Sequence, residues 1–202
     1  MAKLILIRHG ESEWNAKGLW TGFKDIPLTE KGRGEARKAA ESIENIKPDI
    51  AYVSDLTRAK ETLDEIKNVL GLSPVQTVSD IALNERDYGD YTGKNKWEVK
   101  KEVGDEMFLK IRRSWDFPIP NGESLKDVYN RVIPFYEKSI LKDLMDGKNV
   151  IVSAHGNSLR ALIKYLENIT DLDISNLELK TGEVYIYEID KDGKIVGKEI
   201  RN

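Results

Sequence analysis

Two short apolar runs that do not alternate with polar residues constrain the fold of this 202-residue chain most strongly. They span residues 3–7 and 149–153, and both are far too short to cross a membrane. A strand with one face in water alternates apolar and polar side chains, whereas a strand that is covered on both faces does not need to. Both runs therefore predict strands buried between two layers of helices.

Helical spacing of apolar residues separates these runs from further strand-like segments. Thr29 is suited to cap a helix over residues 30–43, and a second helix is expected over residues 58–70. Ser124 is suited to begin another helix, which Pro134 is expected to kink. The remaining expected elements are strands over residues 50–53, 75–78, 183–189 and 195–200 and a helix over residues 159–166. This alternation predicts an α/β fold of three layers, α/β/α, with a mostly parallel central sheet.

The length of the chain and its least regular segment determine the expected domain organisation. A chain of 202 residues is long enough for one domain with a sizeable core. Residues 83–121 are rich in charged and aromatic side chains and show no clear period. We expect a single domain over residues 1–202, in which residues 83–121 form a small, helical, cap-like insertion.

Charge and residue usage exclude several classes of partner and chemistry. The formal net charge of −3 does not favour binding to nucleic acid or to an anionic membrane. The absence of cysteine excludes disulfides and thiolate chemistry. The apolar start of the chain is too short for the core of a signal peptide, so we expect a cytoplasmic protein.

The two histidines of the chain occupy matching positions. His9 follows the first apolar run and precedes Gly10, and His155 follows the second run and precedes Gly156. Ligands bind at the carboxyl ends of strands in open α/β sheets, so both imidazoles are expected to face one site. The alternatives are a structural histidine at each strand end, and a zinc site. A zinc site needs a third ligand, and since no His-rich spacing favours it we expect no metal.

An imidazole in such a site suits phosphoryl transfer. A neutral imidazole is a good nucleophile near pH 7 and can pass a phosphoryl group on. Guanidinium groups match phosphate oxygens, and Arg8 and Arg58 are expected near the same edge of the sheet. A helix that opens near Asn157 adds N–H groups that favour anions. For Arg58 the alternative is a solvated surface position.

Five segments extend this pattern over nearly the whole chain. In the same order, they resemble the motifs of the histidine phosphatase superfamily and, more closely, of its cofactor-dependent phosphoglycerate mutases. The opening segment is Arg-His-Gly-Glu-Ser-Glu-Trp-Asn at residues 8–15. The others lie at residues 20–25 with 27–29, 58–59 with 62–63, 83–89 with 93–96, and 154–160.

The resemblance implies a complete set of site residues. His9 is implied to be the phosphorylated nucleophile, and Glu85 to be the general acid and base for the substrate hydroxyl. The residues implied to hold the phosphoryl group are Arg8, Arg58 and His155. Those implied to line the phosphate pocket or to bind the rest of the substrate are Ser12, Asn15, Thr21, Gly22, Arg86, Tyr88, Lys96, Arg112, Arg113, Gly156 and Asn157.

Some of these residues have a simpler interpretation, and one segment departs from the family. Without the resemblance, Glu85 and Arg86 are interpreted as a surface ion pair. Arg112 and Arg113 reach one ligand only if their helix ends there, and the prolines that follow favour such an end. Residues 114–123 replace a much larger insertion in the longer mutases. The shielding of a phosphohistidine from water therefore depends on this shorter segment.

The expected activity also follows from the resemblance. A phosphorylated His9 is expected to interconvert 3-phosphoglycerate and 2-phosphoglycerate, a step of glycolysis and gluconeogenesis, with 2,3-bisphosphoglycerate as primer and without a metal. The alternatives are a histidine phosphatase that hydrolyses small phosphomonoesters on the same scaffold, and a phospho-ligand sensor without turnover. The expected partner is a small phosphorylated hydroxy acid, and the protein is expected to be a monomer or a homodimer.

Overall fold

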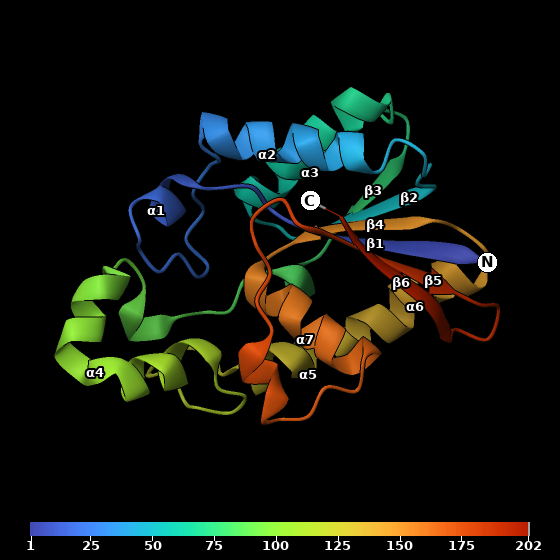
Figure 1. Ribbon diagram of the computed structural model, residues 1–202. Coiled ribbons are helices and arrows are strands. Elements are labelled where there is room, and N and C mark those ends of the chain that lie inside the picture. Colours follow the sequence, from blue (N-terminus) through green and yellow to red (C-terminus); the bar gives the residue numbers. More distant parts are fainter. Residues whose placement is uncertain (202) are drawn as a thin grey trace.

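A six-stranded sheet with the order β3-β2-β4-β1-β5-β6 forms the middle layer of the computed structural model, which describes residues 1–201 (Figure 1). Strands β3, β2, β4 and β1 are parallel, whereas β5 and β6 each pair antiparallel. The mostly parallel sheet predicted from the sequence is confirmed. The strands are β1 (Ala2–Arg8), β2 (Ile50–Val53), β3 (Gln76–Ser79), β4 (Val150–Ala154), β5 (Val184–Ile189) and β6 (Ile195–Arg201).

Helices cover both faces of the sheet (Figure 1). Along β1, Ile5 and Ile7 pack in the apolar cluster of one face, whereas Leu4 and Leu6 pack in the cluster of the other. The strand has no polar face, which explains why its sequence does not alternate. One face carries α2 (Glu30–Ser42) and α3 (Thr57–Leu70), and the other carries α5 (Leu125–Phe135), α6 (Leu141–Met145) and α7 (Gly156–Leu166).

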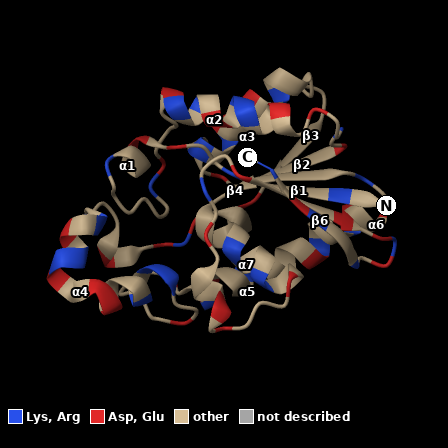
Figure 2. Ribbon diagram, viewed as in Figure 1, with Lys and Arg blue, Asp and Glu red and all other residues tan. Residues whose placement is uncertain are grey.

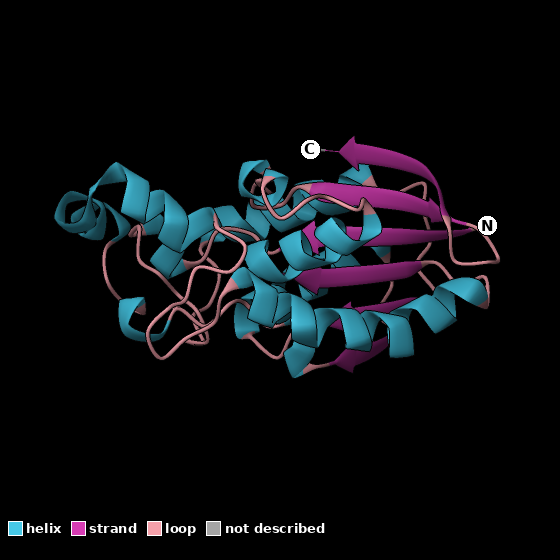
Figure 3. Ribbon diagram, turned by 90° about the horizontal axis from the view of Figure 1, so that it is seen from below, coloured by secondary structure: helices cyan, strands magenta, loops and turns pink. Residues whose placement is uncertain are grey.

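A smaller group of helices and loops lies beyond the carboxyl ends of the parallel strands (Figures 1 and 3). Its main element is α4 (Lys96–Arg113), which is accompanied by α1 (Glu13–Ala16) and the short turn η2 (Gly89–Tyr91). Trp20 packs with Phe108 and Ile111 of α4 in a separate apolar cluster. The residues around α4 thus form a cap with a small core of its own over one edge of the sheet.

Charged residues of both signs are spread over the outer helices (Figure 2). On α4, for example, Lys100 and Lys110 pair with Asp105 and Glu106 at 3.1 and 2.7 Å. Within residues 1–201, no helix is both long and apolar enough to cross a membrane. Because the formal net charge is −3, a site for an anion requires cations that are gathered locally.

Several element boundaries differ from the sequence predictions. Strand β3 begins one residue later than predicted, at Gln76, and α7 begins at Gly156 rather than at residue 159. The predicted helix start at Ser124 is confirmed, and Ser124 and Asp127 form a capping box there. The helix that it begins is not continuous, because α5 gives way to a π-helical turn over Tyr136–Ile140. Pro134 lacks the N–H that a regular α-helix uses, which accounts for a change of helix type just after it.

Gly10 and Gly32 allow the loop after β1 to pack closely against α2. This close contact can be tested by substitution. A Cβ on Gly10 would lie 2.1 Å from the carbonyl oxygen of Gly32, and one on Gly32 would lie 2.1 Å from that of Glu11. We predict that Gly32→Ala lowers the free energy of unfolding by about 1–3 kcal/mol, because the loop that carries His9 has to move.

The matched control is Gly34→Ala on the same helix, where a Cβ would meet no heavy atom within 4 Å. This variant is expected to gain up to about 1 kcal/mol, since alanine is the better helix former. Urea unfolding measures both effects. Equal midpoints for Gly32→Ala and the wild-type protein would contradict the close packing of the loop.

Candidate active site

The parallel pairing of β1 with β4 brings the two histidines together. Arg8 lies beside Ala154 in the strand register, so the next residues, His9 and His155, leave the sheet at the same edge. Their ring centroids are 4.9 Å apart. Both side chains are buried, with 2% and 0% of their surface exposed. The structure therefore brings both imidazoles to one place, as the sequence analysis expected.

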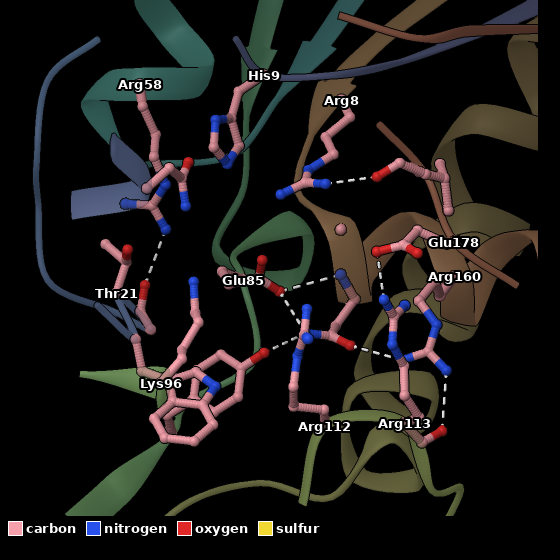
Figure 4. A pocket seen from close by; sticks show the side chains of 17 residues that line it. Arg8, His9, Thr21, Arg58, Glu85, Lys96, Arg112, Arg113, Arg160 and Glu178 are labelled. Atoms are coloured by element: carbon pink, nitrogen blue, oxygen red, sulfur yellow. Dashed lines mark hydrogen bonds and ion pairs between the residues drawn. The ribbon is translucent and has the colours of Figure 1, made fainter. Parts of the chain in front are cut away.

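His9 presents one of its two ring nitrogens to the cavity. Nδ1 lies 2.7 Å from the carbonyl oxygen of Gly10. A carbonyl can only accept, so Nδ1 carries the proton and Nε2 keeps its lone pair. Figure 4 shows the ring between the guanidinium groups of Arg8 and Arg58. Burial, followed by the charges of Arg58 and Arg8, lowers the pKa of His9 well below its usual value, so the imidazole is neutral near pH 7, the form in which an imidazole can act as a nucleophile.

A serine that follows β2 orients the second imidazole. The Ser54 hydroxyl lies 2.6 Å from Nε2 of His155 and accepts a hydrogen bond from the N–H of Leu56 at 3.3 Å. Its proton has no other acceptor among residues 1–201, so Ser54 donates to Nε2 and the ring proton of His155 lies on Nδ1. That Nδ1 is buried without a hydrogen-bond partner in the described chain. The ring next to His9 therefore holds one buried N–H that no described residue accepts.

Two arginines beside His9 are held by neutral groups. Arg58 at the start of α3 donates to two carbonyl oxygens of residues 22–24, both at 2.9 Å, and Arg8 donates to the carbonyl oxygen of Leu179. Burial lowers the pKa of Arg58 to about 10, which leaves it charged near pH 7. With 1% of its surface exposed, Arg58 is not the solvated residue of the alternative interpretation. Neutral carbonyls fix both guanidinium groups without cancelling their charge, which creates an anion site beside Nε2.

Glu85 has one oxygen saturated by the protein and one oxygen free. Its Oε1 accepts from the N–H of Arg86 at 2.9 Å and from both the N–H and the Nδ2 of Asn157 at 3.0 Å. Its Oε2 accepts no hydrogen bond from residues 1–201. Burial alone would raise the pKa of Glu85, but the Arg86 N–H and the charges of Arg58 and Arg8 outweigh burial and hold this pKa below its usual value. Glu85 is therefore an ionised carboxylate with one oxygen ready to take a proton.

The cap supplies the other end of the cavity. Lys96 is the first residue of α4, and Arg112 and Arg113 are its last. Helix α4 therefore ends at Arg113, which meets the condition for Arg112 and Arg113 to reach one ligand. Burial lowers the pKa of Lys96 and of Arg112. Glu178, from the segment before β5, pairs with Arg113 at this end (Figure 4).

Three of the predicted site residues lie behind the cavity wall instead of lining it. Ser12 caps α1, and the ring of His155 packs against that of His9 with 4.9 Å between the centroids. Arg86 has 1% of its surface exposed, packs 4.5 Å from the ring centroid of Tyr88 and donates to the cap backbone. The interpretation of Glu85 and Arg86 as a surface ion pair is wrong, because both side chains are buried. The predicted residues that line the cavity are Arg8, His9, Asn15, Thr21, Gly22, Arg58, Glu85, Tyr88, Lys96, Arg112, Arg113, Gly156 and Asn157.

Four further lining residues were not predicted: Trp20, Arg160, Glu178 and Leu179. Arg160 lies three residues after Asn157, a spacing that places both on one face of α7 and that could have pointed to it. Glu178 and Leu179 come from an irregular segment, for which the sequence offers no periodic signal. Residues 1–201 contain no group of three or more histidine, aspartate or glutamate side chains that could hold a metal ion.

Comparison with known proteins identifies the family. The profile of the histidine phosphatase superfamily (branch 1) matches residues 4–199. The chain is 47% identical over 199 residues to a 2,3-bisphosphoglycerate-dependent phosphoglycerate mutase of Chelativorans sp., covering 98% of this chain and 97% of the relative. It is 48% identical over 197 residues to the enzyme of the same name from Bradyrhizobium diazoefficiens, covering 96% and 95%. The chain belongs to the histidine phosphatase superfamily and, within it, to the family of these mutases.

Solved structures agree with this assignment at the level of the fold. YhfR of Bacillus stearothermophilus superposes with a TM-score of 0.84 at 28% identity, covering 96% of this chain and 94% of that one. A mycobacterial glucosyl-3-phosphoglycerate phosphatase in complex with VO3 also reaches a TM-score of 0.84, at 22% identity and with 100% and 98% coverage. The second likeness shows a shared architecture alone. The expected phosphoglycerate mutase-like fold is confirmed.

The orientation of the two imidazoles can be tested by ¹⁵N NMR. Because the chain has only two histidines, only two sets of ring signals are expected in untagged protein. We predict that both rings carry their proton on Nδ1, and that both stay neutral at pH values where a free imidazole is protonated, since the pKa of each lies well below 6.5. Ser54→Ala is expected to let His155 mix its two tautomers.

Ser79→Ala is the control, because the Ser79 hydroxyl bonds to Asp55 and to the backbone of Ser54 without contacting His155. It is expected to leave both ring spectra unchanged. A wild-type His155 that carries its proton on Nε2 would contradict the assigned direction of the hydrogen bond from Ser54.

Proposed function

We propose that the protein interconverts 3-phosphoglycerate and 2-phosphoglycerate through a phosphorylated His9 that is primed by 2,3-bisphosphoglycerate. The observation that carries the proposal is the order of groups along one cavity. Cations flank Nε2 of His9 at one end, a second cationic cluster lies at the cap end, and the free oxygen of Glu85 belongs to the same lining (Figure 4). This order suits a small ligand with an anionic group at each end and a hydroxyl between them.

The positive charges of the residues that line the cavity match the negative charges of the primer, 2,3-bisphosphoglycerate. Arg8, Arg58, Lys96, Arg112 and Arg113 line the cavity, and of these only Arg113 forms an ion pair with a described carboxylate. Such unpaired cations suit a ligand that carries several negative charges. When it is bound, 2,3-bisphosphoglycerate supplies the phosphoryl group that charges His9. The mutase names of relatives at 47% and 48% identity further support this ligand.

In the proposed reaction, His9 acts as the carrier and Glu85 as the proton shuttle. Glu85 takes the proton of the substrate hydroxyl on Oε2, while the hydroxyl oxygen bonds to phosphorus and the bond from phosphorus to Nε2 breaks. His9 is thereby returned to its neutral form. Once the ligand has turned round, Nε2 takes the other phosphoryl group, and Glu85 gives its proton to the oxygen that leaves. The net change is the position of one phosphoryl group.

The surrounding charges stabilise the group in transit. Its equatorial oxygens bear the negative charge that develops, and the guanidinium groups of Arg8 and Arg58, which flank the His9 ring, are the donors proposed to stabilise it. Because these donors are fixed before the reaction, no reorganisation is needed during it. With 2% of its surface exposed, His9 is poorly accessible to water, which favours transfer to a bound hydroxyl over hydrolysis.

A phosphatase that uses the same phosphorylated His9 is the second candidate function. One observation favours it, namely the short segment 114–123, which supplies little cover over the cavity. In the structure this segment lies against η2, where the N–H of Asp90 donates to the carbonyl oxygen of Pro120 at 3.1 Å. It therefore completes the cap wall but contributes no lining residue.

The proposal predicts strict dependence on the primer. Purified protein is expected to convert 3-phosphoglycerate only after 2,3-bisphosphoglycerate has been added, and to carry an acid-labile phosphate. His9→Ala is expected to lose both the activity and the label, because no other nitrogen lies in the place of Nε2. Absence of mutase turnover in the primed wild-type protein, or undiminished turnover in His9→Ala, would refute the proposal.

The ion pair at the cap end predicts a change in substrate affinity. Glu178 competes with a substrate anion for Arg113, and its side chain is 63% exposed. Exposed pairs are worth about 0.2–1 kcal/mol, so Glu178→Gln is expected to lower the KM for phosphoglycerate by up to about fivefold with little change in kcat. Asp192→Asn, in the turn after β5, removes the same charge far from the site and is expected to leave KM unchanged. A KM that is unaltered or raised in Glu178→Gln would rule out this competition.

A further inference from the structure

Arg160 is a buried arginine of α7 that interacts only with neutral groups. It is 3% exposed. Its Nη1 donates to Oδ1 of Asn157 at 2.9 Å, and its Nη2 donates to the carbonyl oxygens of Arg113 at 2.9 Å and Ile174 at 2.8 Å. Burial lowers its pKa to about 10, which leaves it charged near pH 7. A buried cation without a counter-ion is costly, so its place next to the cavity calls for a function.

The first consequence of Arg160 is the orientation of the Asn157 amide. An amide side chain can place either its oxygen or its NH₂ group toward a neighbour, and a guanidinium group has donors only. The oxygen of Asn157 therefore faces Arg160. Its Nδ2 faces the other way and donates to Oε1 of Glu85 and to the hydroxyl of Tyr88, both at 3.0 Å. The opposite orientation would place an amide oxygen against a carboxylate and an NH₂ group against a guanidinium.

The second consequence is a physical link between the two ends of the cavity. The carbonyl of Arg113 that Arg160 binds is the last of α4, the helix that carries the cationic cluster of the cap. The same guanidinium group thus contacts the neighbour of Glu85 and the end of α4. A substitution of Arg160 therefore removes a hydrogen bond to Asn157, next to Glu85, and a hydrogen bond to the carbonyl oxygen of Arg113 at the end of α4.

We propose that Arg160 is a positioning residue, which sets the Asn157 amide so that Glu85 keeps one oxygen saturated and one oxygen free for the substrate hydroxyl. The inference rests on the proposed function for the role of Glu85. Its geometric part, the chain from Arg160 through Asn157 to Glu85, stands independently of the substrate. It can therefore be measured without turnover.

Other charged and titratable groups also face Glu85, and the test has to separate them from Arg160. Arg8 from β1, Arg58 from α3 and Lys96 from α4 act on its carboxylate through their charges, and Tyr88 lies beside it. Removal of Arg160 can therefore change the pKa of Glu85 in two ways. One is the direct loss of a positive charge, and the other is the loss of the Asn157 donor.

The test is a ¹³C NMR titration of the Glu85 carboxyl group, whose signal is identified by its absence in Glu85→Gln. In Arg160→Met we expect the midpoint to move upward by about 1 pH unit, because the carboxylate loses a donor and gains an amide oxygen nearby. The same substitution in an Asn157→Leu background is expected to add almost nothing. The acid limb of mutase activity is expected to move upward with the midpoint in Arg160→Met.

Lys164→Met is the matched control. Lys164 lies one turn further along α7, is also largely buried, and binds the carbonyl of Ile169 and the carboxylate of Asp171 without touching Asn157. Its loss is expected to lower the melting temperature while leaving the Glu85 midpoint and the pH profile unchanged. The control thus separates positioning from a general loss of stability.

Two results would overturn the inference: an unchanged Glu85 midpoint in folded Arg160→Met, or an equal shift in the Asn157→Leu background. If Arg160→Met does not fold, Asn157→Leu alone is decisive, since an unchanged midpoint there excludes the amide route and an upward shift supports it. If the primed wild-type protein lacks mutase activity while the titrations respond as expected, the proposed function fails and the positioning role stands.

Discussion

The parallel pairing of β1 with β4, inside a sheet that is covered on both faces, is the constraint on which the rest of this structure depends. It delivers His9 and His155 to one edge in register and buries both. The close contact of Gly10 with Gly32 then holds the loop that follows His9 against α2. The chemistry of the site begins from this arrangement, because an imidazole that is buried and neutral is both nucleophilic and protected from water.

Apart from Arg113, which pairs with Glu178, the arginines of the site that have hydrogen-bond partners are held by groups that do not neutralise them. Arg58 and Arg160 donate to backbone or amide oxygens, and Arg8 donates to a backbone carbonyl. The carboxylate of Glu85 keeps its negative charge in the same way, because the described hydrogen-bond donors bind only its Oε1 and leave Oε2 free. Positive charge therefore remains available to a phosphoryl group, and a proton acceptor remains available to a hydroxyl. The cost of burying these groups is offset by the core that the sheet and its helices form around them.

Sequence reasoning identified the features that rest on local patterns. The buried strands, the helix start at Ser124 and the meeting of the two histidines all followed from local sequence patterns and from the geometry of open sheets. The family resemblance supplied Glu85 and the residues of the cap, which no periodicity would have indicated. The role of Arg160 and the presence of Glu178 in the cavity depend on tertiary contacts between segments far apart in the chain. The burial of Arg86 against Tyr88 likewise depends on how the cap packs. The adjacent carboxylate of Glu85 therefore suggested a surface ion pair that the structure does not contain.

The central claim is that phospho-His9 gives its group to a bound hydroxyl rather than to water. The most direct test labels the protein with ³²P from 2,3-bisphosphoglycerate, removes free ligand, and follows the label after addition of 3-phosphoglycerate or of buffer alone. The label is expected to pass to phosphoglycerate far faster than it appears as inorganic phosphate in buffer. Release as inorganic phosphate at the same rate with and without 3-phosphoglycerate would contradict the central claim, and would make the protein a phosphatase.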